Sequence, residues 1–160
     1  MGVLKISAAA AALASCLLVG PTSATTDRNA FTGYWMSDKG DGATEIKPCG
    51  EGLCGYIYSI LVLPDPSKPA RDNNNVKPEL RNRPLCGLQV LGSLKRVADD
   101  AFGDGWVYDP ETGKQYSVEI TLKGKTLAVR GYVGTKFMGK TVEWSRAASA
   151  PPKCSPPKAA

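Results

Sequence analysis

The sequence predicts an all-β protein, an eight-stranded up-and-down antiparallel barrel with one long Pro-rich loop. Three observations predict this fold. Eight short segments rich in β-branched and aromatic residues follow one another and are separated by turn residues. No segment shows a convincing helical period of apolar residues. All links between the segments are short except one, so successive strands are expected to pair, and closure of the sheet would leave no free edge.

The first 24 residues are expected to be a secretory signal peptide. Lys5 supplies a positive charge, an uncharged and largely apolar run covers residues 6–20, and small residues lead to a cleavage point after Ala24. A membrane-spanning helix is less favoured, because a span usually needs about 20 apolar residues. The mature chain is therefore expected to begin at Thr25, in the periplasm or outside the cell.

The same segment offers a second way of processing. Residues 13–16, Leu-Ala-Ser-Cys, have the pattern in which Cys16 becomes the lipid-bearing N-terminus of a lipoprotein. The apolar run continues past this cysteine through residues 17–19, whereas the linker of a lipoprotein usually turns polar there. Simple secretion is therefore favoured, and a lipoprotein anchored through Cys16 is the alternative.

The mature chain has the length of one domain and a mildly basic charge. Removing 24 of the 160 residues leaves 136, and the loss of Lys5 lowers the formal net charge from +5 to +4. No run of five like charges occurs, so nucleic-acid binding is not expected, although peripheral contact with an anionic envelope is compatible with this charge. Residues 25–146 are expected to form the barrel, and residues 147–160, which hold four prolines, an extended tail.

The cysteine content agrees with export. The mature chain keeps an even number of cysteines, namely Cys49, Cys54, Cys86 and Cys154. In an oxidising compartment four cysteines suggest up to two disulfides, with three possible connectivities. The close spacing of the first two, with two glycines between them, favours a bridge across a hairpin mouth, which would leave the other two to tie the tail to the body. A zinc site is disfavoured, because the chain has a single close pair and no histidine.

The predicted strands alternate with turn signals. They cover residues 32–37, 43–49, 54–63, 88–97, 105–109, 115–122, 126–133 and 140–146. Glycine-containing turns are expected at residues 104–105, 109–113, 123–125 and 134–139, and one short turn at residues 98–102. Residues 64–86 hold five prolines and cannot form a central strand or a long helix. They are expected to form either a flap across one barrel end or a polar surface crossover.

Candidate ligand-binding residues come from the seventh strand and from the long loop. Arg130 and Tyr132 alternate with apolar neighbours. If they face the barrel interior, a cation and a phenol would meet a ligand with an anionic head group; if they face outwards, they are ordinary solvated side chains. In the long loop, Arg81 and Arg83 are expected to guard a mouth or to pair with Asp72, and Arg81 and Asp72 are included as tentative ligand contacts.

The sequence contains no recognisable catalytic constellation. The absence of histidine removes the commonest general base, and four bridged cysteines would leave no thiolate. No spacing marks two of the available carboxylates as an acid–base pair. Asp72 lies in an Asp-Asn-Asn-Asn run, but the twelve-residue calcium loop pattern is missing. An enzyme is therefore not expected, and neither a catalytic residue, a cofactor nor a metal site is predicted.

Several short motifs follow one another in a distinctive order. They are Gly33-Tyr34-Trp35, Cys49-Gly50 with Leu53-Cys54-Gly55, Asp72-Asn73-Asn74-Asn75, Leu80-Arg81-Asn82-Arg83-Pro84-Leu85-Cys86-Gly87, Tyr108-Asp109-Pro110 with Gly113-Lys114-Gln115-Tyr116, Leu127-Ala128-Val129-Arg130-Gly131-Tyr132-Val133-Gly134 and Trp144-Ser145-Arg146. Together they resemble the bacterial exported family of domain of unknown function 2147 (DUF2147), over residues 31–146. The resemblance implies a lipocalin-like barrel of the calycin group, and it implies architecture more than activity. The tail with Cys154 lies outside the pattern.

The lipocalin comparison also implies structural roles. Barrels of this type place a Gly-x-Trp on the first strand and an arginine late in the barrel, where the arginine packs over the indole and closes one end. Gly33, Trp35 and Arg146 occupy matching positions. A guanidinium over an indole face contributes about 0.5–2 kcal/mol, depending on desolvation.

Two functions follow from this fold. The favoured prediction is an exported binding protein that holds a small amphiphilic or anionic ligand in the barrel. The alternative is a structural or interaction protein of the cell envelope with a barrel filled by its own side chains, because an eight-stranded barrel is compatible with either. The sequence leaves the ligand, the inward face of the late strands and the oligomeric state open.

Overall fold

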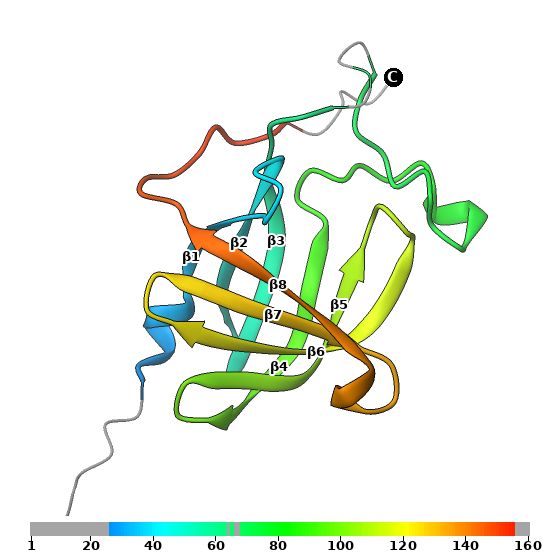
Figure 1. Ribbon diagram of the computed structural model, residues 1–160. Helices are drawn as coiled ribbons and strands as arrows, with labels where there is room; N and C mark the ends of the chain where they lie inside the picture. The colour runs from blue at the N-terminus through cyan, green and yellow to red at the C-terminus, as the bar shows by residue number, and fades with distance from the viewer. Residues whose placement is uncertain (1–25, 64, 66–67, 156–160) are drawn as a thin grey trace, which may run out of the picture.

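The chain folds as a closed barrel of eight antiparallel strands, in which each strand pairs with the next and β8 pairs with β1 (Figure 1). The computed structural model describes residues 26–63, 65 and 68–155, so the predicted signal segment and Cys16 lie outside the described residues. The strands are β1 (Gly33–Met36), β2 (Gly42–Cys49), β3 (Gly52–Ile60), β4 (Gln89–Ala98), β5 (Ala101–Asp109), β6 (Lys114–Lys123), β7 (Thr126–Tyr132) and β8 (Gly139–Arg146). Short 3-10 helices are η1 (Arg28–Phe31), η2 (Pro78–Leu80) and η3 (Lys136–Met138). The predicted all-β, eight-stranded barrel is confirmed.

One predicted turn is wrong. Asp104 and the glycine after it were expected to separate two elements, but both lie inside β5, which already begins at Ala101. Asp104 has a φ of 54°, and the pairing with β6 shifts between Phe102 and Gly105. The Asp-Gly pair therefore forms a bulge within a continuous strand, because the residues on both sides keep their partners in β6.

Side chains from all parts of the sheet fill the middle of the barrel. The buried core comprises Phe31, Trp35, Ile46, Leu53, Leu91, Leu94, Phe102, Val118, Ile120, Leu127 and Val129. In the late strands the alternation is regular: Ile120 pairs with Val129, and both are buried, whereas Glu119 pairs with Arg130 on the other face. The interior of β7 is therefore the face that carries Leu127 and Val129.

The Pro-rich segment packs on the outside of the barrel. Arg71 and Pro84 form an isolated β-bridge, and Asn74 donates hydrogen bonds to the carbonyl oxygens of Pro110 and Glu111 in the β5–β6 turn. The described part of this segment therefore crosses the surface beside β5.

Two disulfides pair as the spacing predicted. Cys49 bonds to Cys54 across the β2–β3 hairpin, and Cys86 bonds to Cys154, with a Cα–Cα distance of 5.7 Å in each case. The tail runs along the outside of the first three strands, and the amide of Cys154 donates to the carbonyl of Tyr58 in β3. No helix among the described residues is long and apolar enough to cross a membrane.

Candidate functional site

One end of the barrel is closed by η1. Phe31 is fully buried and packs edge-on against Phe102, with ring centroids 4.9 Å apart, and the indole of Trp35 donates to the carbonyl of Phe31 at 2.8 Å. The guanidinium of Arg146 lies 4.2 Å from the centroid of Trp35. Gly33 has a φ of +110°, and a Cβ there would lie 3.3 Å from Arg146, so both backbone and space favour glycine. Among the residues that the structure describes, η1 and Arg146 cover this end of the core.

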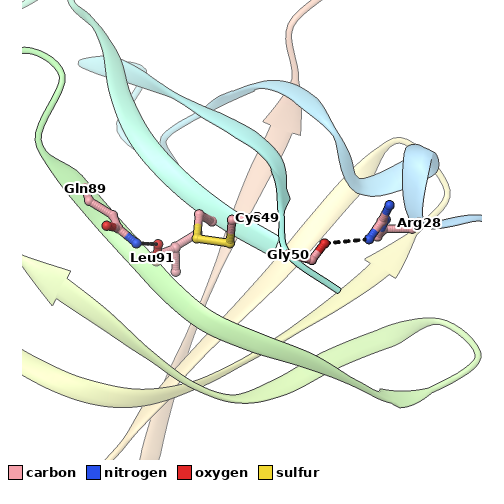
Figure 2. The surroundings of a disulfide bond; sticks show 6 residues. Arg28, Cys49, Gly50, Gln89 and Leu91 are labelled. Atoms are coloured by element: carbon pink, nitrogen blue, oxygen red, sulfur yellow. Dashed lines mark hydrogen bonds between the residues drawn. A yellow bond between two sulfur atoms is a disulfide. The ribbon is translucent and has the colours of Figure 1, made fainter. Parts of the chain in front are cut away.

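The β2–β3 hairpin is attached to η1 at the same end of the barrel. The Cys49–Cys54 disulfide joins the two sides of the hairpin, and Arg28 of η1 donates to the carbonyl of Gly50 in the turn at 3.2 Å (Figure 2). The disulfide thus fixes the turn to which η1 is attached.

The opposite end, which we call the mouth, carries the β1–β2, β3–β4, β5–β6 and β7–β8 loops. On its interior side Val107 pairs with Tyr116, and both are only half-buried. Gly131 faces them, since a Cβ there would lie 3.6 Å from Val107 and 3.7 Å from Tyr116. Gly131 therefore places no side chain against Val107 and Tyr116.

A lysine stands on the interior side of this mouth. Lys140 pairs with Gly131 and shares its face of β8 with Val142 and Trp144, which pack against the core. Lys140 is exposed, and its ammonium group makes no hydrogen bond or ion pair within the part of the chain that the structure describes. An unpaired ammonium group beside half-buried apolar side chains is suited to an amphiphilic anion.

An ion pair spans the mouth. Lys39 in the β1–β2 loop lies 2.6 Å from Glu111 in the β5–β6 turn, and these loops are on opposite sides of an eight-stranded ring. The hydrogen bond to Glu111 raises the pKa of Lys39. Since both side chains are more than half exposed, at 57% and 62%, the pair contributes little to stability.

Asp72 is held in a buried cluster of polar side chains. It is fully buried, and its carboxylate accepts hydrogen bonds from the hydroxyl of Tyr108 at 2.6 Å, the amide of Asn75 at 2.7 Å and the guanidinium of Arg83 at 2.7 Å. Burial, and then the hydrogen bond to Asp72, raise the pKa of Tyr108. Arg83 is therefore the arginine that pairs with Asp72, whereas Arg81 donates to the carbonyl of Asn75 at 2.8 Å. This cluster fastens the long loop to the outer face of β5.

Arg130 and Tyr132 lie on the outer face of β7, so the inward orientation considered for them is wrong. Arg130 donates from Nε to the carbonyl of Lys136 at 2.9 Å and from Nη1 to the hydroxyl of Thr141 at 2.9 Å. The reason is register: Val129 occupies the core, and successive side chains of a strand point to opposite faces. Their predicted contact with a ligand inside the barrel therefore has no geometric basis.

Lys140 is a candidate contact that the sequence reasoning did not include. Lys140, Val142 and Trp144 alternate with Thr141 and Glu143. This alternation alone predicts that the lysine lies on the same face of the strand as the two apolar residues. No group of three potential metal ligands occurs among the residues described.

Comparisons with known proteins agree with this architecture. A solved structure with a similar fold is HP1028 from the human pathogen Helicobacter pylori, which is described as belonging to the lipocalin family. The similarity covers 67% of this chain and 73% of that protein, with 28% sequence identity and a TM-score of 0.59. No curated protein matches the sequence. Residues 33–146 match the family of domain of unknown function 2147, described as uncharacterized proteins conserved in bacteria. The chain therefore belongs to the DUF2147 family, with a lipocalin-like barrel.

Proposed function

We propose that the protein binds a small amphiphilic anion at the mouth of its barrel, in the periplasm or outside the cell. The observation that carries the proposal is the unpaired Lys140 on the interior side of the mouth, next to Gly131. In this arrangement the head group contacts the ammonium, and the apolar part lies against Val107 and Tyr116.

The packing of the barrel limits the size of such a ligand. The η1 half is filled by fully buried side chains, among them Trp35 and Phe31. An apolar chain would therefore reach only the mouth half of the interior. Short or medium-chain carboxylates suit this depth better than long-chain fatty acids.

The two disulfides support the proposed compartment. One joins two strands of the barrel and the other joins the long loop to the tail, and bonds of this kind persist in oxidising compartments. The two disulfides indicate a non-cytoplasmic protein. A location in the periplasm or outside the cell is the part of the proposal that rests on the predicted signal peptide.

Titration with decanoate, and with decanol as a neutral analogue, tests the site. We expect Lys140→Met to weaken decanoate binding at least tenfold and to leave decanol binding unchanged, because a charge-assisted hydrogen bond contributes about 1.5–3 kcal/mol. Lys123→Met is the matched control, since Lys123 is an exposed lysine at the η1 end of β6. Equal decanoate affinities of the wild type and Lys140→Met would contradict the proposal.

The filled barrel is the second candidate, and the completely buried core favours it. Native mass spectrometry of protein purified from its own host separates the two. A stoichiometric added mass supports the binding protein, whereas a bare chain that also fails to bind decanoate supports an interaction protein.

A further inference from the structure

The β7–β8 tip, residues 133–138, exposes an unusual amount of apolar surface. The chain has three phenylalanines: Phe31 and Phe102 are buried, but Phe137 is 97% exposed. Its neighbour Met138 is 78% exposed, and Val133 is 65% exposed. Single exposed apolar residues are common, but three large ones in six residues indicate an interaction surface.

The tip is held in place by polar contacts from the outer face of the barrel. Arg130 donates from Nε and Nη2 to the carbonyl of Lys136, and the ammonium of Lys136 pairs with Glu119 in β6. The short helix η3 adds a hydrogen bond from the amide of Met138 to the carbonyl of Thr135 at 3.1 Å. These contacts fix the backbone on which Phe137 stands, so ordering the tip adds little entropic cost to binding.

The charge around the tip has a positive excess. Residues 126–142 contain Arg130, Lys136 and Lys140 and no acidic residue. In space, Glu119 pairs with Lys136 and Asp104 lies near enough to act on it, so two acidic residues stand against three cations. An aromatic and a methionine side chain at a projecting tip, flanked by cations, are the features that bind the boundary between anionic head groups and acyl chains. A projecting tip can insert into a fluid bilayer surface without any match of shape. Binding to a grooved protein partner would need such a match.

We propose that the β7–β8 tip binds the surface of an anionic lipid bilayer, with Phe137 and Met138 inserted between the head groups. The tip belongs to the same end of the barrel as the mouth, so binding would turn the mouth towards the lipid. The proposal does not depend on ligand binding at Lys140, because it rests on the outer residues of the tip.

Co-sedimentation with phosphatidylcholine vesicles, with and without phosphatidylglycerol, tests this surface. We expect the mature wild-type protein to bind the anionic vesicles, and Phe137→Ser/Met138→Ser to bind at least tenfold more weakly. The double variant should fold normally, since both side chains are exposed in the structure. Val97→Ser is the matched control, because Val97 is also exposed, at 40%, but lies near the η1 end of β4.

A second measurement locates the contact. Fluorescence of Phe137→Trp should be quenched by brominated lipid in anionic vesicles, while that of Val97→Trp should not. The proposal is wrong if wild-type protein fails to bind either vesicle, or if Phe137→Ser/Met138→Ser binds as tightly as wild type. A concentration-dependent dimer that this double variant abolishes, without any vesicle binding, would instead identify a second copy of the chain as the partner.

Discussion

At the scale of single residues, position relative to the core decides the role of each polar or aromatic side chain. Trp35 is fully buried and donates its indole proton, whereas Phe137 of the β7–β8 tip is almost fully exposed. Asp72 is buried with all its partners in place, and Lys140 has none among the residues that the structure describes. Side chains of similar chemistry therefore either stabilise the fold, when they are buried, or are available for binding, when they are exposed.

Trp35→Ala should lower the free energy of unfolding by about 3–5 kcal/mol, because a large aromatic side chain in the core is replaced by a cavity. Arg146→Ala should share part of that loss, since its guanidinium packs over the indole. Urea denaturation of both single variants and the double variant measures this as a double-mutant cycle. Strictly additive losses would show that the two side chains do not interact.

The buried tyrosine predicts a pH dependence. The folded state raises the pKa of Tyr108 above its value of about 10 in an unfolded chain, so its contribution to stability is complete below about pH 10. It is lost as the pH rises through the folded pKa. The stability difference between wild type and Tyr108→Phe should therefore shrink above pH 10 in urea denaturation series. A difference that stays constant up to pH 12 would contradict this prediction.

At the scale of elements, long-range links join segments that strand pairing alone leaves apart. The Asp72 cluster joins the long loop to β5, and the Cys86–Cys154 disulfide joins that loop to the tail. The amide of Ala147 also donates to the carbonyl of Tyr34, at the start of the tail. The disulfide therefore links the loop, which packs on β5, to the tail, which packs on β1 and β3.

The two disulfides should contribute unequally to stability. They close loops with sequence separations of 5 and 68 residues. In the chain-entropy estimate this difference corresponds to about 2 kcal/mol for Cys49–Cys54 and about 4 kcal/mol for Cys86–Cys154. Thermal and urea unfolding of the Cys49→Ser/Cys54→Ser and Cys86→Ser/Cys154→Ser variants measures both. A larger loss for the shorter loop would show that chain entropy is not the main term.

At the scale of the whole molecule, the two barrel ends differ. η1 and the Trp35–Arg146 contact close one end, while the mouth carries Lys140, the Lys39–Glu111 ion pair and the β7–β8 tip. Both proposed activities therefore belong to a single end of the barrel.

At this scale we predict that the protein is exported from the cytoplasm. N-terminal sequencing of the protein from its host should begin at Thr25, because residues 1–24 have the charged, apolar and small-residue order of a signal peptide. Mass spectrometry of the same protein shows whether Cys16 is present and carries a lipid. A lipid-modified Cys16 would replace secretion by anchoring, and a full-length cytoplasmic chain would contradict export altogether.

The sequence by itself determined the number and order of the strands and the barrel, and it favoured one of three possible cysteine connectivities. These features depend on local patterns: β-branched runs, glycine turns and a pair of cysteines five residues apart. Asp104 shows the limit of such patterns, because an Asp-Gly pair makes a turn or a bulge according to whether the flanking residues keep their partners. Only the tertiary structure supplies that pairing.

The tertiary structure alone decided which face of each strand turns inwards. A shift by one residue reverses every side chain of a strand, so only the register of β7 and β8 places Arg130 on the outer face and Lys140 on the interior side. Likewise, the sequence supplied Asp72, but its partner Tyr108 is 36 residues away, and no local pattern joins them. Contacts between distant segments form only when the barrel closes. They show which polar residues, such as Asp72, hold the fold together and which have no partner within it.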